Sequence, residues 1–186
     1  MATEKVLTPE FRVSFPAVFV PRSPMDGAEP KYSVVMLFPK NADLSGLKKI
    51  AKAAITEKWG DKPPKELRNP FRDGDTKELE GYAGMIFITA SSKNKPGLVD
   101  ASRQPIISAD EFYAGCYARA TVNAYAYNKN GNAGVSFGLQ NIQKLRDGEP
   151  FSGRTKPEDD FDAVSDGTQA QSSIQKPAPV AKEFWD

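Results

Sequence analysis

The segment Cys116-Tyr-Ala-Arg-Ala-Thr-Val-Asn-Ala-Tyr-Ala-Tyr127 alternates small apolar residues with larger aromatic and polar ones. A period of two is typical of a β-strand, because successive side chains of a strand point to opposite faces. The even-numbered positions form a small apolar face that suits packing against a core. The odd-numbered positions form a second face of aromatic, cationic and polar side chains: Tyr117, Arg119, Thr121, Asn123, Tyr125 and Tyr127.

Alternating or apolar runs on either side of this segment predict further strands. With the strand around the quoted segment, the predicted strands cover residues 11–20, 31–38, 85–92, 115–127 and 134–144. The Asn130-Gly131 step predicts a hairpin turn between the last two strands. Pro16 in the first strand predicts an edge position or a bend.

One stretch has apolar residues at helical spacing, residues 44–59, with Asp43 as the expected N-cap and Gly60 at the end. Five strands and one mid-chain helix predict a mainly β fold. The leading candidate is an OB-like five-stranded barrel.

The composition argues against conventional catalysis. The 186 residues include no histidine and one cysteine, Cys116. Ser–His and Cys–His nucleophile pairs, a disulfide framework and a multi-cysteine zinc site are therefore excluded. We expect a protein that is not an enzyme and needs no cofactor. A less favoured alternative is a metal-dependent nuclease that uses the acidic residues Asp73, Asp75 and Glu78, with Glu80 beside them.

The charge is divided unevenly along the chain. Residues 157–186 contain seven acidic and two basic residues, a net charge of −5, whereas the preceding residues contain 23 basic and 17 acidic ones, a net charge of +6. This asymmetry indicates a body that binds a polyanion and an acidic tail. We expect a domain over residues 1–153 and a tail over residues 154–186.

Residues 165–181 are rich in Gly, Ser, Gln, Pro and Ala, so we expect the C-terminal tail to be disordered. It ends in two aromatic residues among acids, which suits a short docking peptide better than a solvated terminus. The predicted partner-binding residues are Glu183, Phe184, Trp185 and Asp186.

The odd-numbered face of residues 116–127 suits a single-stranded nucleic acid. Bases stack on flat aromatic rings at about 1–3 kcal/mol each, largely regardless of sequence. We expect Tyr117, Tyr125 and Tyr127 to stack bases, and Arg119, Asn123, Lys93, Lys95, Arg103 and Lys129 to contact phosphates or polar groups. The alternative is that the tyrosines only form cross-strand pairs that stabilise a sheet.

A longer segment carries a resemblance to a known family. Gly138-Leu-Gln-Asn-Ile-Gln-Lys-Leu-Arg-Asp-Gly-Glu-Pro-Phe-Ser-Gly-Arg154, followed by Glu158-Asp-Asp-Phe-Asp162, resembles the closing segment of tailed-phage single-stranded-DNA-binding proteins. Val13-Ser-Phe-Pro, Lys31-Tyr-Ser-Val and the central helix fit the same family. The resemblance implies an OB fold, binding of single strands without sequence specificity, and a role in phage DNA replication and recombination.

Phage proteins of related architecture have acidic C-termini that end in an aromatic residue. The resemblance therefore implies that residues 183–186 contact phage or host replication and recombination proteins and compete with DNA for the groove. The expected location is the host cytoplasm, with no membrane association. RNA binding and a homodimer stay open, and a phage structural or assembly protein is the second alternative.

Overall fold

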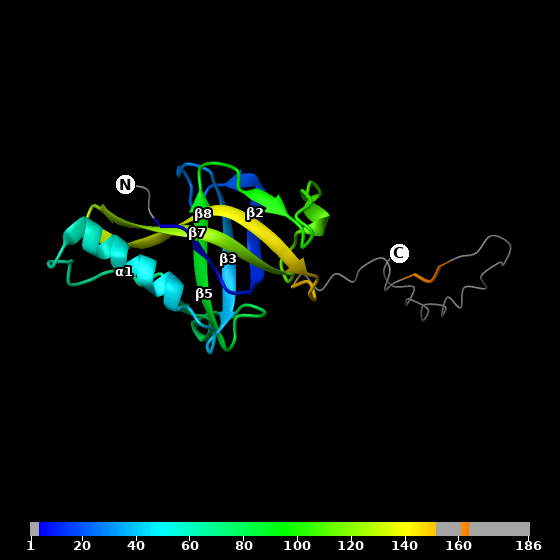
Figure 1. Cartoon of the computed structure of the whole chain (residues 1–186), viewed down its shortest axis with the longest axis horizontal. Coiled ribbons are helices and arrows are strands. Elements are labelled where there is room, and N and C mark those ends of the chain that lie inside the picture. The colour runs from blue at the N-terminus through cyan, green and yellow to red at the C-terminus, as the bar shows by residue number, and fades with distance from the viewer. Residues whose placement is uncertain (1–3, 152–160, 164–186) are drawn as a thin grey trace, which may run out of the picture. The chain divides into compact units, whose positions relative to one another are not determined.

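The computed structural model describes residues 4–151 and 161–163, which contain eight strands and one α-helix (Figure 1). The chain divides into two units, Met1–Arg154 and Thr155–Asp186. Of the second unit, only residues 161–163 are described, and they are exposed without regular secondary structure. The predicted disordered tail and its terminal aromatic residues lie outside the described residues.

Five strands close into a ring through pairwise hydrogen bonding in the order β2-β3-β5-β8-β7-β2. The pairs are antiparallel except β5 with β8, which is parallel. This OB-like arrangement confirms the predicted fold class. The strands are β2 (Phe11–Arg22), β3 (Lys31–Pro39), β5 (Met85–Ser92), β7 (Tyr117–Lys129) and β8 (Asn132–Arg146).

Three short strands extend this sheet, and two 3-10 turns lie in its loops. They are β1 (Val6–Leu7), β4 (Arg72–Asp73), β6 (Gly97–Val99), η1 (Gly74–Thr76) and η2 (Ala109–Glu111). The sequence did not predict the short strands, because two or three residues are too few to show a period.

The core fills the inside of the ring. Every even-numbered residue from Cys116 to Ala124 is buried, as the alternation predicts, and Ala126 packs partly buried against the same cluster. The helix α1 (Ser45–Trp59) buries Leu47, Ile50, Ala51 and Ala54 in that cluster. The helix begins one residue later than the prediction, so Leu44 holds the N-cap position. Asp43 still contributes, since its Oδ1 accepts a hydrogen bond from the backbone N–H of Ser45 at 3.0 Å.

Strand β2 is bent in its middle. Its register against β3 shifts between Ser14 and Ala17, and Phe15 has a φ of 42°. Pro16 lies in this bulge, beyond the residues of β2 that pair with β7. The bend and the open edge together accommodate the missing N–H of the proline.

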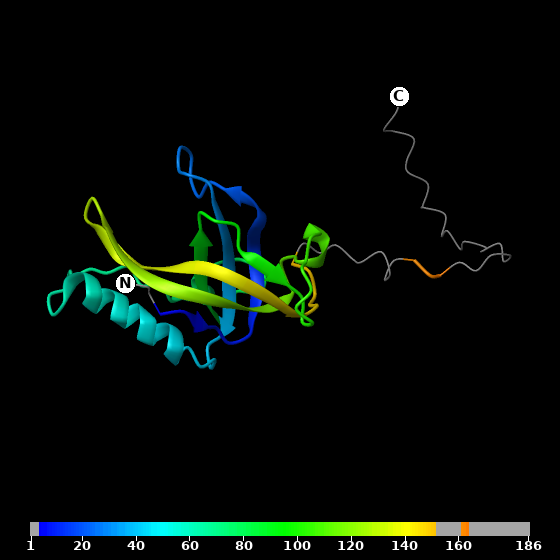
Figure 2. The same cartoon turned by 45° about the horizontal axis from the view of Figure 1, so that its top comes forward.

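The β7–β8 hairpin crosses the other strands of the ring, and its closed end lies beside α1 (Figures 1 and 2). At the turn, Asn130 and Gly131 have φ values of 51° and 84°. Positive φ at both central residues is what a tight hairpin turn of this twist requires, so the Asn-Gly prediction is confirmed. Within the described residues, no helix combines the length and apolar character that a membrane span needs.

Candidate nucleic-acid interface

The outward face of β7 carries the predicted aromatic and polar residues. Its odd-numbered side chains are partly or largely exposed, while the even-numbered residues from Ala118 to Ala124 are buried. Tyr125 is the most accessible of the three predicted stacking residues, with 40% of its surface exposed. In the described part of the chain, it makes no hydrogen bond, ion pair or ring contact, so both its ring and its hydroxyl are accessible to a ligand.

Strand β8 places small residues directly opposite this part of β7. Gly134 pairs with Tyr127, Ser136 with Tyr125, and Gly138 with Asn123. A Cβ at Gly134 would lie 2.8 Å from the Tyr127 hydroxyl, and a Cβ at Gly138 would collide with Oδ1 of Asn123. The two side chains thus lie across the glycines, which have no Cβ to obstruct them. Asn123 is held there because its Oδ1 accepts a hydrogen bond from Nε2 of Gln140 at 3.2 Å.

A row of small residues continues from Asn123 across the ring. Gly138 pairs with Ser91 of β5, Ser91 with Ser33 of β3, and Ser33 with Ala17 of β2. Ser33 and Ser91 alternate with the buried residues Val34 and Ala90, so they lie on the outer side of the ring. Because the side chains of this row are small, a nucleic-acid backbone can approach the strands closely along it.

Lysines lie beside this row, where Lys93 follows Ser91 and Lys31 precedes Ser33 by two residues. Lys93 Nζ lies 2.8 Å from Oε2 of Glu29, and this hydrogen bond is the main cause of the lowered pKa of the Glu29 carboxyl. The charges of Lys31 and Lys129 lower the pKa of Glu29 further, so the predicted residues Lys93 and Lys129 lie near the same carboxylate. Lys95, in the same turn as Lys93, has its Nζ 5.9 Å from the ring centroid of Phe19.

A second cationic group lies along the β7–β8 hairpin. Arg103 and Arg119 line a shallow cavity of about 220 Å³ together with Leu7, which is 54% exposed. Gln143 links Arg119 to the turn that carries Arg103, because its Oε1 accepts from Nε of Arg119 at 2.9 Å and its Nε2 donates to the carbonyl oxygens of Asp100 and Ala101 at 3.2 Å. In the residues described, only Nε of Arg119 is bonded, which leaves its terminal nitrogens to contact an anion.

The turn that carries Arg103 is ordered by one carboxylate. Oδ1 of Asp100 accepts hydrogen bonds from the backbone N–H groups of Ser102 and Gln104, at 2.8 and 2.9 Å. Arg103 itself has a φ of 65°, and its N–H donates to the Asp100 carbonyl at 3.0 Å. The turn presents the exposed Arg103 side chain beside β7, although the sequence showed only an irregular segment there.

The structure does not bring Tyr117 together with the other two tyrosines. Its ring is covered by Arg146, whose guanidinium carbon lies 3.7 Å from the ring centroid, and Arg12 lies 5.8 Å from the same centroid. Nη2 of Arg146 in turn binds Glu10 at 2.9 Å. Tyr117 is therefore part of a packed charged cluster at the opposite end of β7 from Tyr125.

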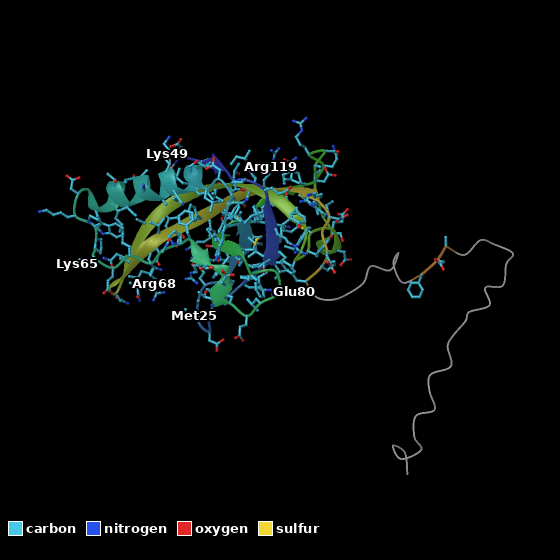
Figure 3. All side chains as sticks on the ribbon, turned by 90° about the horizontal axis from the view of Figure 1, so that it is seen from below. Met25, Lys49, Lys65, Arg68, Glu80 and Arg119 are labelled. Atoms are coloured by element: carbon cyan, nitrogen blue, oxygen red, sulfur yellow. The ribbon has the colours of Figure 1, made fainter. Side chains whose placement is uncertain are left out.

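Arg68 is a cation near the hairpin that the sequence analysis did not single out. Its N–H donates to the Ala133 carbonyl at 2.9 Å, and its Nη2 donates to Oδ1 of Asn132 at 3.2 Å. These contacts fix the exposed Arg68 beside the start of β8. Figure 3 shows Arg68 and Arg119 on opposite sides of the molecule, so they belong to different parts of the surface. The sequence around Arg68 shows no pattern typical of DNA binding, because Arg68 lies in a long polar connection.

Two of the acidic residues considered as metal ligands, Asp73 and Asp75, make other contacts. Lys40 binds both Asp73, at 3.0 Å, and Asp75. The pKa of Asp73 is lowered mainly by the N–H of Asp75, and the pKa of Asp75 mainly by the N–H of Gly84, with Lys40 acting on both. Over residues 4–151 and 161–163, no three acidic or cysteine side chains gather as metal ligands. The two aspartates instead order the connection before β5.

An OB-like ring with exposed aromatic and cationic side chains on the outward face of β7 is typical of proteins that bind single-stranded nucleic acids. Residues 4–172 match the family described as "Enterobacter phage Enc34, ssDNA-binding protein". The chain belongs to this family of phage single-stranded-DNA-binding proteins, as its resemblance implied.

Known proteins from three phages are similar to this chain. It is 36% identical over 161 residues to putative protein p50 of Acyrthosiphon pisum secondary endosymbiont phage 1, which covers 80% of this chain and 87% of that protein. The single-stranded DNA-binding protein of bacteriophage Enc34 aligns with a TM-score of 0.65 at 25% identity, covering 85% of this chain and 90% of that one. The T7 single-stranded DNA-binding protein gp2.5 aligns with a TM-score of 0.56 at 15% identity, over 92% and 100% of the two chains, which shows a shared fold.

Proposed function

We propose that this protein binds single-stranded DNA without sequence preference and without catalysing a reaction, in phage DNA replication or recombination. The observation that carries the proposal is the exposed ring of Tyr125 above the small residues of β8. Family membership supports the same conclusion, and the Enc34 protein has been solved in complex with ssDNA. Binding an unpaired strand shifts the duplex equilibrium by mass action, so strand protection needs no ATP and no metal.

Base stacking is assigned to Tyr125 and Tyr127. Both rings lie on the outer face of β7, and the small Ser136 opposite Tyr125 leaves room beside its ring. Because every base has an aromatic face, such stacking tolerates any sequence. Asn123, held by Gln140, supplies an amide at the same surface for a base edge or sugar.

Phosphate contacts are assigned to the two cationic groups. Lys93 and Lys129 lie near Glu29, Lys95 lies near Phe19, and Arg103 and Arg119 line the shallow cavity along the hairpin. Neutralising phosphates releases condensed counterions, so the affinity for DNA decreases as the salt concentration rises. For a single strand, the slope of log affinity against log salt concentration is about −0.7 per phosphate contact. RNA shares the phosphates and the bases and is expected to compete.

We assign two roles to the acidic C-terminal residues: they recruit replication proteins and they compete with DNA. These residues include Glu183, Phe184, Trp185 and Asp186. The support is chemical: this part of the chain carries a net charge of −5 and two aromatic residues, whereas the body carries +6. A tethered anion competes at a high effective concentration set by its linker.

The test is fluorescence titration of labelled oligo-dT at several salt concentrations, with unlabelled duplex and RNA as competitors. We expect salt-sensitive binding that duplex DNA competes with weakly. A chain ending at Gly153 should bind more tightly than the full chain. Equal affinity of the two chains would remove the competing role of the tail, and salt-insensitive or absent binding in both would overturn the proposed function.

A further inference from the structure

Three residues from separate parts of the chain form a row near the closed end of the β7–β8 hairpin. Gly134 of β8 pairs with Tyr127 on one side and forms an isolated parallel bridge with Arg68 on the other. Residues that pair across strands have their side chains on the same face of a sheet. Val135, the next residue along β8, is buried in the core, so the row of Arg68, Gly134 and Tyr127 lies on the outward face.

The missing side chain of Gly134 lets the other two approach each other. A Cβ at Gly134 would lie 2.8 Å from the Tyr127 hydroxyl and 3.0 Å from Cβ of Arg68. Gly134 is buried although it lies on the outward face, because these two side chains cover it. The hydroxyl end of the Tyr127 ring and the base of the Arg68 side chain therefore meet above the same glycine.

The connection that carries Arg68 is fixed on both sides of this row. The N–H of Arg68 donates to the Ala133 carbonyl at 2.9 Å, and its Nη2 donates to Oδ1 of Asn132 at 3.2 Å. Three residues further on, the Phe71 ring packs edge-on against the core residue Phe137, with 5.8 Å between the ring centroids. An arginine that is already held in place loses little conformational entropy when a ligand binds to it.

The guanidinium of Arg68 keeps donors for a ligand. The residue is exposed, and within residues 4–151 and 161–163 its guanidinium is bonded only through Nη2, to an amide and not to a carboxylate. Nε and Nη1 can therefore donate to an anion, and guanidinium groups bind phosphate oxygens through paired N–H groups. An aromatic ring with a guanidinium at its rim matches a nucleotide, which has a flat base and a phosphate one sugar away.

We propose that Tyr127 and Arg68 form one nucleotide subsite, in which the ring stacks the base and the guanidinium contacts the phosphate of that nucleotide. A strand that stacks on the outward face of β7 then crosses β8 at Gly134 and reaches the connection between α1 and β4. The proposal rests on the proposed function, because it concerns the same single strand, and it adds Arg68 and this connection to the DNA-binding surface.

The first test removes the cation from the full-length chain. Arg68→Gln should weaken binding of labelled oligo-dT by roughly tenfold at low salt, the effect of one charge-assisted hydrogen-bonded contact. The slope of log affinity against log salt concentration should become less negative by about 0.7, and Arg68→Lys, which keeps the charge, should retain the slope of the parent. Lys65→Gln is the matched control, because it removes the same charge from an exposed position in the same connection. It should change affinity and slope much less.

The second test asks whether Arg68 and Tyr127 act on the same nucleotide. Tyr127→Ala removes the stacking platform, so in that background Arg68→Gln should weaken binding by less than about threefold. Tyr127→Phe keeps the ring and should preserve the full effect of Arg68→Gln. The unfolding temperature of each variant, measured alongside, separates loss of binding from loss of fold.

Two results would overturn the proposal. One is an equal effect of Arg68→Gln and Lys65→Gln, and the other is a double variant of Arg68 and Tyr127 whose losses simply add. If either occurs while Tyr125→Ala still weakens binding, the proposed function stands without this subsite. A parent chain that does not bind oligo-dT overturns both.

Discussion

Arg146 stacks on Tyr117, with its guanidinium carbon 3.7 Å from the ring centroid. The contact joins the start of β7 to the end of β8, where the two residues are also paired across the strands. Glu10 and Arg12 complete the cluster. One tyrosine of the outward face, Tyr117, therefore stabilises the ring of strands. The other two, Tyr125 and Tyr127, lie at the far end of β7 and remain accessible.

Replacing Tyr117 by alanine should affect stability and leave DNA binding nearly unchanged. The substitution removes a partly buried ring and leaves Arg146 without a stacking partner, which should lower the free energy of unfolding by roughly 1–2 kcal/mol. Urea denaturation measures this loss. A large loss of affinity for oligo-dT at unchanged stability would instead assign Tyr117 to the DNA contact.

Replacing Tyr125 by alanine should weaken DNA binding and leave the stability of the protein nearly unchanged. The ring packs against no other ring in the described residues, so stability should change by less than about 0.5 kcal/mol. Affinity for oligo-dT should fall by about 1–3 kcal/mol, the typical contribution of one stacked base. Tyr125→Phe is the matched control, because it retains the ring, and it should bind nearly as tightly as the parent protein.

The sequence predicted the part of the structure that depends on local periodicity. Alternation over residues 116–127 identified the strand and its two faces, and the buried even-numbered positions confirm them. The Asn130-Gly131 step identified the hairpin, because this turn needs positive φ at both residues. The family resemblance is confirmed as well, since its motifs lie within the matched residues 4–172.

Contacts between distant residues could not be predicted from the sequence. Nothing near Tyr117 shows that Arg146 covers its ring, because the pairing depends on a register shift at the start of β7. The grouping of Arg103 with Arg119 depends on Gln143, which is 40 residues away from Arg103. The bulge at Phe15 depends on the pairing of β2 with β3, which local pattern does not specify.

Arg119 should contribute to the salt dependence of binding. Arg119→Gln removes one cation, so the slope of log affinity against log salt should become less negative by about 0.7. Lys58→Gln is the matched control, because it removes the same charge from the exposed face of α1. An equal change of slope in both variants would show that net charge alone, and not the position of Arg119, governs binding.

Gly138→Ala should displace Asn123, which lies opposite Gly138 on β7. The new Cβ collides with Oδ1 of Asn123, so the variant should be destabilised by about 1–3 kcal/mol and bind oligo-dT more weakly. Adding Asn123→Ala removes the obstructing amide and should restore most of the lost stability. Additive losses in the double variant would show that the two residues are not coupled.

The most direct test of the central claim is to locate the bound strand on the protein. Oligo-dT with bromodeoxyuridine at single positions can be photocrosslinked to the full chain and the adducts mapped by mass spectrometry. We expect adducts at Tyr125 and Tyr127, because bases that stack on these rings lie in contact with them. Adducts confined to α1 or to the surface around Phe15, with none on β7, would show that DNA does not bind to the outward face of β7.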